Sequence, residues 1–135
     1  DLAVLNISQN SLHFLPNTVG SITALKELVV EQNSLKSLPE SLGQCSLIVK
    51  LVVTSNRLQQ IPDCVSTLVK LIVLILKDNK IKEISSSITN LAQLKLLHLD
   101  QNYLACIPDY LGALTTMEDL DVSKNPFVQR FPAAL

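Results

Sequence analysis

An asparagine recurs every 23 residues along the chain, and this spacing limits the possible folds more than any other feature. The six positions are Asn10, Asn33, Asn56, Asn79, Asn102 and Asn125. The residue six positions after each of the first five asparagines is a proline in four units and a serine in one: Pro16, Pro39, Pro62, Ser85 and Pro108. A repeat of about 20–50 residues indicates a stack of equivalent units, each packed on its neighbours, and not one central core.

Aliphatic residues fill further columns with the same spacing. One column is Leu5, Leu28, Leu51, Leu74, Leu97 and Leu120, and a second is Ile7, Val30, Val53, Leu76, Leu99 and Val122. The two columns are two residues apart, so in a strand their side chains point to the same face. The columns therefore predict one short strand in each unit. The strands of successive units are expected to form a parallel sheet with ~4.8 Å between strands. The stretch after each proline leaves room for only a short helical piece.

These columns give the unit L-x-x-L-x-L-x-x-N-x-L-x-x-L-P-x-x-L-x-x-L-x-x, which resembles the leucine-rich repeat family over the whole chain. The 23-residue unit with Leu-Pro after the asparagine resembles the intracellular, Ras-related subclass. The resemblance implies an α/β solenoid with a parallel sheet on its concave face and short helical or irregular segments on its convex face. We expect residues 1–135 to form one domain of about six units, and the start at Asp1 indicates a segment of a longer chain.

The repeated asparagines are expected to form hydrogen bonds with the backbone groups of the turns at which the chain leaves the sheet. A carboxamide donates and accepts hydrogen bonds at once, so it can pair turn backbone groups that would otherwise be buried without partners. Stacking the units places equivalent side chains next to one another. The sequence therefore predicts a structural ladder made of all six asparagines.

Strand residues that point away from the apolar columns are the candidates for partner binding, because the resemblance implies binding on the concave face. They combine an apolar centre with charged ends, which is the usual anatomy of a protein-binding surface. The predicted residues are Glu27, Val29, Glu31, Lys50, Val52, Thr54, Val73, Ile75, Lys77, Leu96, His98, Asp100, Asp119 and Asp121. We expect Val52 and Ile75 at the centre. The alternative is that these β-branched residues reflect strand propensity alone.

The resemblance implies a non-catalytic protein–protein interaction module in the cytoplasm, with a protein partner such as a small GTPase or a phosphatase. Three other origins stay open: a substrate-docking or regulatory segment of a larger signalling enzyme (kinase, cyclase or ubiquitin ligase), an extracellular recognition domain, and an engineered chain. The cysteines Cys45, Cys64 and Cys106 are an odd number without paired spacing, which favours a reducing compartment. Neither end shows a polar cap, so self-association through the ends also stays open.

Charge and composition exclude several other classes. The chain has 11 Lys and Arg against 12 Asp and Glu, which provides no basic field for a phosphate backbone, so we expect no nucleic-acid binding. Although 47% of the residues are hydrophobic, the longest apolar run covers residues 71–76. A membrane span needs roughly 18–20 apolar residues, so none is expected. With three glycines and no Gly-rich loop, the sequence predicts no cofactor.

One catalytic arrangement is suggested by spacing. His98 and Asp121 occupy equivalent positions in neighbouring units, and Ser123 follows on the same face, as in a Ser-His-Asp triad. Nothing in the sequence predicts an enclosed site, oxyanion donors or a strained turn at the serine. Asp100, Asp119 and Asp121 also offer oxygen ligands for a divalent cation, but their spacing matches no metal-binding loop. We therefore expect neither a catalytic residue nor a metal site.

Overall fold

A computed structural model describes residues 1–127, in which six short strands alternate with five 3-10 helices. The strands are β1 (Val4–Asn6), β2 (Glu27–Val29), β3 (Lys50–Val52), β4 (Val73–Ile75), β5 (Leu96–His98) and β6 (Asp119–Asp121). The helices are η1 (Asn17–Ser21), η2 (Glu40–Gln44), η3 (Asp63–Thr67), η4 (Ser86–Asn90) and η5 (Asp109–Ala113). The expected α/β solenoid is confirmed. The predicted domain extends to residue 135, and residues 128–135 lie outside the described part of the chain.

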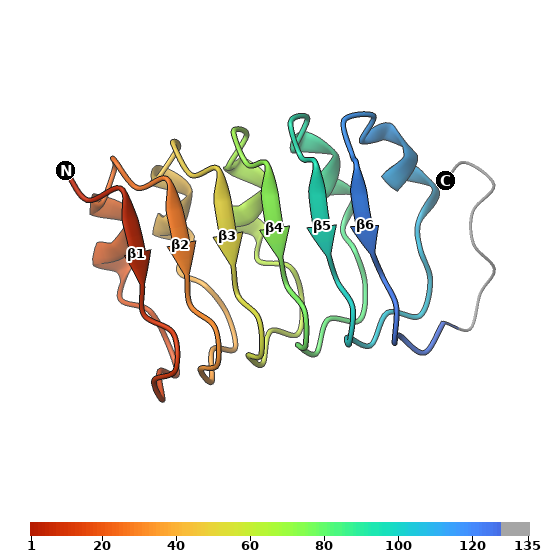
Figure 1. The fold of residues 1–135 in the computed structure, drawn as a ribbon, viewed down its shortest axis with the longest axis horizontal. Helices are drawn as coiled ribbons and strands as arrows, with labels where there is room; N and C mark the ends of the chain where they lie inside the picture. The colour runs from red at the N-terminus through yellow and green to blue at the C-terminus, as the bar shows by residue number, and fades with distance from the viewer. Residues whose placement is uncertain (128–135) are drawn as a thin grey trace.

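The six strands form one open parallel sheet, in which each strand pairs with the next one along the chain (Figure 1). Equivalent residues of adjacent units face each other, as Leu28 faces Leu51 and Leu51 faces Leu74. Each column of the sequence therefore becomes a row across the sheet. The helices lie behind the sheet in this view, each packed on the helix of the next unit.

The apolar columns form the core between the sheet and the helices. Leu28, Leu51, Leu74 and Leu97 are all 0% exposed, whereas Leu120, in the last strand, is only partly buried. Full burial of one such side chain stabilises the fold by about 1.5–3 kcal/mol. A terminal unit loses part of this stabilisation because it packs against a neighbour on one side only.

Each helix begins directly after the proline of its unit, or after Ser85 in the fourth unit. Proline has no N–H and a fixed φ, so it suits the residue that precedes a helix. In η2 the carbonyl oxygen of Pro39 accepts a hydrogen bond from the backbone N–H of Leu42 at 3.0 Å. Ser85 has the same extended backbone, and its hydroxyl oxygen accepts from the backbone N–H of Ser87. Among residues 1–127, no helix is long and apolar enough to cross a membrane.

The residue before each asparagine adopts a left-handed backbone conformation. The φ angles lie between 52° and 58° at Gln9, Gln32, Ser55, Asp78, Gln101 and Lys124. This region favours glycine, and none of the six is a glycine or is branched at Cβ. The turn repeats because the bonds made by the following asparagine hold it.

Candidate functional site

The repeated asparagines join neighbouring units, as Asn56 illustrates. Its Nδ2 donates to the carbonyl oxygens of Val53 and Thr54 in its own turn, at 3.3 and 3.2 Å. The same Nδ2 donates to Val30 O of the preceding unit at 2.9 Å. Its Oδ1 accepts a hydrogen bond from the backbone N–H of Leu35, also in the preceding unit, at 3.0 Å. One side chain thus holds two successive turns.

The same bonds recur at four further asparagines, and the first one differs. Asn33, Asn79, Asn102 and Asn125 each donate to three carbonyls and accept one N–H, 21 residues earlier in the chain. Asn10 donates only to Ile7 O and Ser8 O of its own turn. The asparagine side chains therefore connect five of the six described turns to the unit before them.

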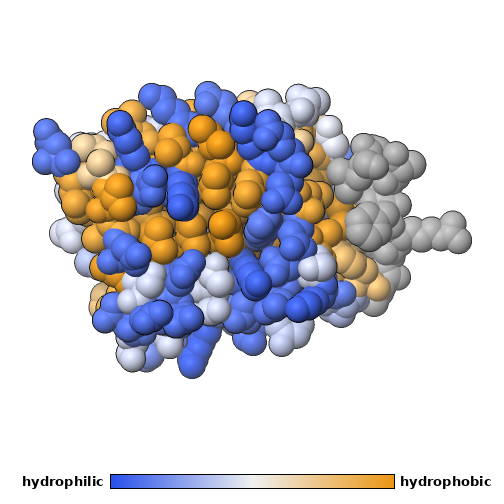
Figure 2. All heavy atoms as spheres, in the orientation of Figure 1, coloured by the Kyte–Doolittle hydropathy of each residue, from blue (hydrophilic) through white to orange (hydrophobic). Residues whose placement is uncertain are grey.

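The outward strand residues form the sheet face, which we define by three rows. The first row is Val4, Glu27, Lys50, Val73, Leu96 and Asp119, the middle row is Asn6, Val29, Val52, Ile75, His98 and Asp121, and the third row is Ser8, Glu31, Thr54, Lys77, Asp100 and Ser123. Figure 2 shows hydrophobic atoms over the middle of this face and hydrophilic atoms around them. The face therefore has the predicted distribution of apolar and charged side chains.

Two predicted binding residues have little accessible surface. Val52 is 4% exposed and Asp100 is 5% exposed. Val29, Ile75 and Leu96 are partly exposed. Ile75, and not Val52, is the accessible centre of the face.

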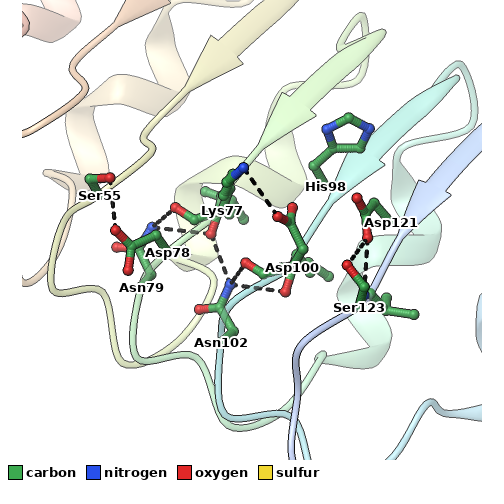
Figure 3. A network of polar contacts seen from close by, with 12 residues as sticks. Ser55, Lys77, Asp78, Asn79, His98, Asp100, Asn102, Asp121 and Ser123 are labelled. Carbon is green, nitrogen blue, oxygen red and sulfur yellow. Dashed lines mark hydrogen bonds and ion pairs between the residues drawn. The ribbon is translucent and has the colours of Figure 1, made fainter.

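Asp100 sits between two units at the acidic end of the face (Figure 3). Its Oδ2 lies 3.5 Å from Nζ of Lys77, whose side chain is 45% exposed. Its Oδ1 is buried and has no hydrogen-bond partner among the described residues. A buried carboxylate oxygen without a donor is destabilising, so this site lacks one hydrogen bond. The sequence did not predict the burial of Asp100.

The three groups of the suspected triad do not act together. Nε2 of His98 lies 3.0 Å from Oδ2 of Asp119, whereas Ser123 donates to Oδ1 of Asp121 through its hydroxyl at 2.7 Å and its backbone N–H at 3.0 Å. His98 and Asp121 are lateral neighbours, as predicted from their spacing. The serine hydroxyl nevertheless bonds to the Asp121 carboxylate and not to the imidazole, so the order of contacts in a Ser-His-Asp triad is not formed.

Ser123 also changes the acidity of Asp121. Its hydroxyl, followed by its backbone N–H, lowers the pKa of the Asp121 carboxyl by hydrogen bonding to the charged form. Asp121 is therefore an anion throughout the physiological pH range. Among residues 1–127 no three His, Cys, Asp or Glu side chains are arranged to hold a metal ion. What the acidic end offers chemically is negative charge next to apolar surface.

The repeat and the sheet define the class of protein: a leucine-rich repeat solenoid, a fold that generally serves as a non-enzymatic protein-interaction module. Residues 46–104 match the family model described as leucine rich repeat. The match covers less than half of the chain, and the same repeat continues through all six stacked units, so the described chain has the leucine-rich repeat fold. No curated protein matches the sequence.

Similar solved structures come from a bacterium and from plants. An internalin of Listeria monocytogenes has a TM-score of 0.77 and 27% identity over 93% of this chain and 36% of its own. The ectodomain of the receptor kinase SOBIR1 of Arabidopsis thaliana has a TM-score of 0.76 and 28% identity over 91% of this chain and 69% of its own. The plant peptide hormone receptor RGFR1, in complex with RGF2, has a TM-score of 0.85 and 28% identity over 98% of this chain and 22% of its own. The chain thus spans well under half of the internalin and of the hormone receptor.

Proposed function

We propose that this chain binds a protein or peptide partner on its sheet face and has no catalytic activity of its own. The observation that carries the proposal is the partly exposed apolar centre formed by Val29, Val73, Ile75 and Leu96, on a face that no helix within residues 1–127 covers. An exposed apolar patch with polar residues around it is a common feature of protein-interaction sites. The in-register rows present these side chains as one surface.

Two similar structures support a peptide or protein as the partner. RGFR1 was solved in complex with RGF2, and PEPR1 was solved with AtPEP1; the latter has a TM-score of 0.82 and 27% identity to this chain. Both proteins are several times longer than the chain, which covers 22% of RGFR1 and 19% of PEPR1. They support the class of ligand and do not select a particular one.

The absence of catalysis is proposed from the arrangement of polar groups. Ser123 bonds to Asp121, and His98 bonds to Asp119, so the serine and the imidazole of a Ser-His-Asp triad are not paired at this end of the face. The open sheet also leaves the groups in contact with water, which weakens electrostatic stabilisation of a transition state. A binding role needs neither enclosure nor a base.

Two locations are proposed for this role. The first is the cytoplasm, where the chain would bind a small GTPase or a phosphatase, as the resemblance to the intracellular subclass implies. All three cysteines are free thiols, which fits a reducing compartment. The second is an extracellular recognition domain, which is favoured by the similarity to the SOBIR1 ectodomain. A fractionation of cells that produce the full-length protein separates the two.

The test of the binding face is affinity capture with matched variants. Ile75→Glu places a charge at the accessible centre, and we expect it to remove a partner that the wild-type chain captures. Val69→Glu is the control, because Val69 is an equally apolar residue, 52% exposed, in the loop between η3 and β4. Both variants are first compared with the wild type by thermal unfolding. Equal capture by all three folded baits would contradict the proposal.

A further inference from the structure

Alternate strands of the sheet face present side chains at a spacing that matches an extended peptide. Neighbouring strands lie ~4.8 Å apart, so residues on every second strand lie ~9.6 Å apart. A polyproline II segment has three residues per turn and rises ~3.1 Å per residue, which places every third side chain on one side at ~9.3 Å intervals. A segment that crosses the strands in this conformation therefore meets every second strand with every third residue.

The middle row supplies the contacts in this register. Val29 on β2 and Ile75 on β4 are apolar and partly exposed, and Asp121 on β6 is charged. Between them lie Val52, which is buried, and His98, which turns to Asp119. The accessible pattern along the row is therefore apolar, apolar, acidic at two-strand intervals.

The acidic end has unused hydrogen-bonding capacity. Both bonds from Ser123 reach Oδ1 of Asp121, so within residues 1–127 its Oδ2 accepts no hydrogen bond. Asp100, one strand away, has a side chain that is 7% exposed, and its Oδ1 lacks a donor. Lys77 is the one ion-pair partner of Asp100 among these residues and is itself 45% exposed, so it can turn aside. A cationic group with several N–H donors would satisfy Oδ2 of Asp121 and would lie near the negative charge of Asp100.

We propose that the partner of this face is an extended segment with apolar side chains at its first and fourth positions and an arginine at its seventh, in either chain direction. The apolar side chains contact Val29 and Ile75, and the guanidinium binds at Asp121. This inference rests on the proposed function. Arginine fits better than lysine because its planar fork donates to two carboxylate oxygens at once.

The other end of the face does not offer an equivalent binding site for a basic residue. Glu27 and Glu31 lie on and just after β2, but Lys50 is the lateral neighbour of Glu27 and offsets part of their charge. At β6, Asp119 and Asp121 face no lysine or arginine of the sheet rows beyond Lys77, which already pairs with Asp100. The charge of the face therefore selects the β6 end for the basic residue.

The experiment is a nuclear magnetic resonance titration of the 135-residue chain with three synthetic peptides. The first is Leu-Pro-Pro-Leu-Pro-Pro-Arg, together with its reversed sequence, because proline favours the required conformation. The second replaces the arginine with glutamate. The third, Leu-Pro-Leu-Pro-Arg-Pro-Pro, has the same composition with the contacts two residues apart.

We expect one direction of the first peptide to shift the amide signals of Val29, Ile75 and Asp121 and to bind at least tenfold more tightly than the second and third peptides. Asp121→Asn should remove the preference for arginine over glutamate while retaining the bonds from Ser123 to Oδ1. Asp109→Asn, on η5, is the control and should retain the preference.

The outcomes separate this inference from the proposed function. If all peptides bind alike, or if Asp121→Asn retains the preference for arginine, the register and charge assignment is overturned. If no peptide binds while the captured partner still depends on Ile75, the inference fails and the proposed function stands. If neither the peptides nor a captured partner depends on this face, both fail.

Discussion

Nδ2 of Asn56 donates a hydrogen bond to the carbonyl oxygen of Val30, 26 residues earlier in the chain, at 2.9 Å. The bond joins the turn of one unit to Val30, the buried residue that follows β2 in the unit before it. Asn56 is 6% exposed, so water cannot replace the bonds that its side chain makes. A residue that first attracts notice by its spacing therefore acts as a connection between units.

Asn56→Ala is expected to lower the free energy of unfolding by about 2–3 kcal/mol, because several buried backbone groups lose their partners at once. Chemical denaturation measures the change. Gln59→Ala is the surface control, since Gln59 is exposed. Asn10→Ala should have an effect intermediate between the two, because Asn10 bonds only within its own exposed turn. Equal effects for Asn56 and Gln59 would contradict the ladder.

Gly20→Ala is expected to destabilise the chain by about 1–3 kcal/mol through overpacking. A Cβ at Gly20 would lie 2.4 Å from the backbone carbonyl oxygen of Ser41, in the next unit, and backbone cannot move aside without separating the units. At Gly43 the nearest atom is Oγ1 of the Thr67 side chain, at 2.7 Å, and a side chain can rotate. Thermal unfolding should therefore show a larger loss for Gly20→Ala than for Gly43→Ala, and the reverse order would count against this packing.

Lys77→Met is expected to lower the free energy of unfolding by about 1–2 kcal/mol, because it leaves the buried Asp100 carboxylate without a cation. Lys95→Met is the matched control. Lys95 pairs with Glu118 at 3.4 Å, but these side chains are 53% and 70% exposed, and exposed pairs contribute about 0–1 kcal/mol. Denaturant titrations of both variants compare the two ion pairs. If Lys77→Met lost no more stability than Lys95→Met, the burial of Asp100 would have no energetic consequence.

Ser123→Ala should raise the pKa of Asp121 towards its ordinary value, because the serine hydroxyl is the main cause that lowers it. A carboxyl with a lowered pKa in the folded state stabilises the fold above its unfolded pKa, about 3.9, and that contribution is lost as the pH falls through the folded pKa. The variant should therefore lose less stability than the wild type between pH 5 and pH 2. A pH titration of the Asp121 carboxyl by nuclear magnetic resonance follows the shift directly, and an unchanged midpoint would refute it.

Cys64 is expected to be unreactive in the folded chain. Burial raises the pKa of its thiol to about 11, so only about one molecule in a thousand carries the thiolate at pH 8. Burial also raises the pKa of Cys45, whereas Cys106 is partly exposed. Ellman's reagent at pH 8 should modify Cys106 first and all three only after unfolding. Rapid modification of Cys64 in the native chain would show that this part of the solenoid opens.

Much of the fold could be predicted from the sequence because a solenoid is periodic. Leu28, Leu51 and Leu74 hold equivalent positions in the chain, and parallel pairing of adjacent units makes them neighbours in the sheet. The same periodicity predicted the short helices after the prolines and the lateral register of His98 with Asp121 in the sheet. In such a fold, a spacing in the chain translates directly into a position in space.

The left-handed backbone before each asparagine could not be predicted in this way. Gln32 and Lys124 are not typical of positive φ, and their conformation depends on hydrogen bonds made by the next residue. The sequence nevertheless contains one sign of this conformation. The six residues share one position in the repeat, and none of them is branched at Cβ.

By itself the sequence determined the order of the units, the residues of the core rows and the composition of the sheet face, because each follows from a period of 23 residues. Only the tertiary structure decided which of those face residues are accessible and how they pair. Val52 is buried, His98 turns to Asp119 and not to Asp121, and Asp100 is buried beside Lys77. These outcomes depend on side-chain size and rotation across strands, which vary between units and which a repeat does not specify.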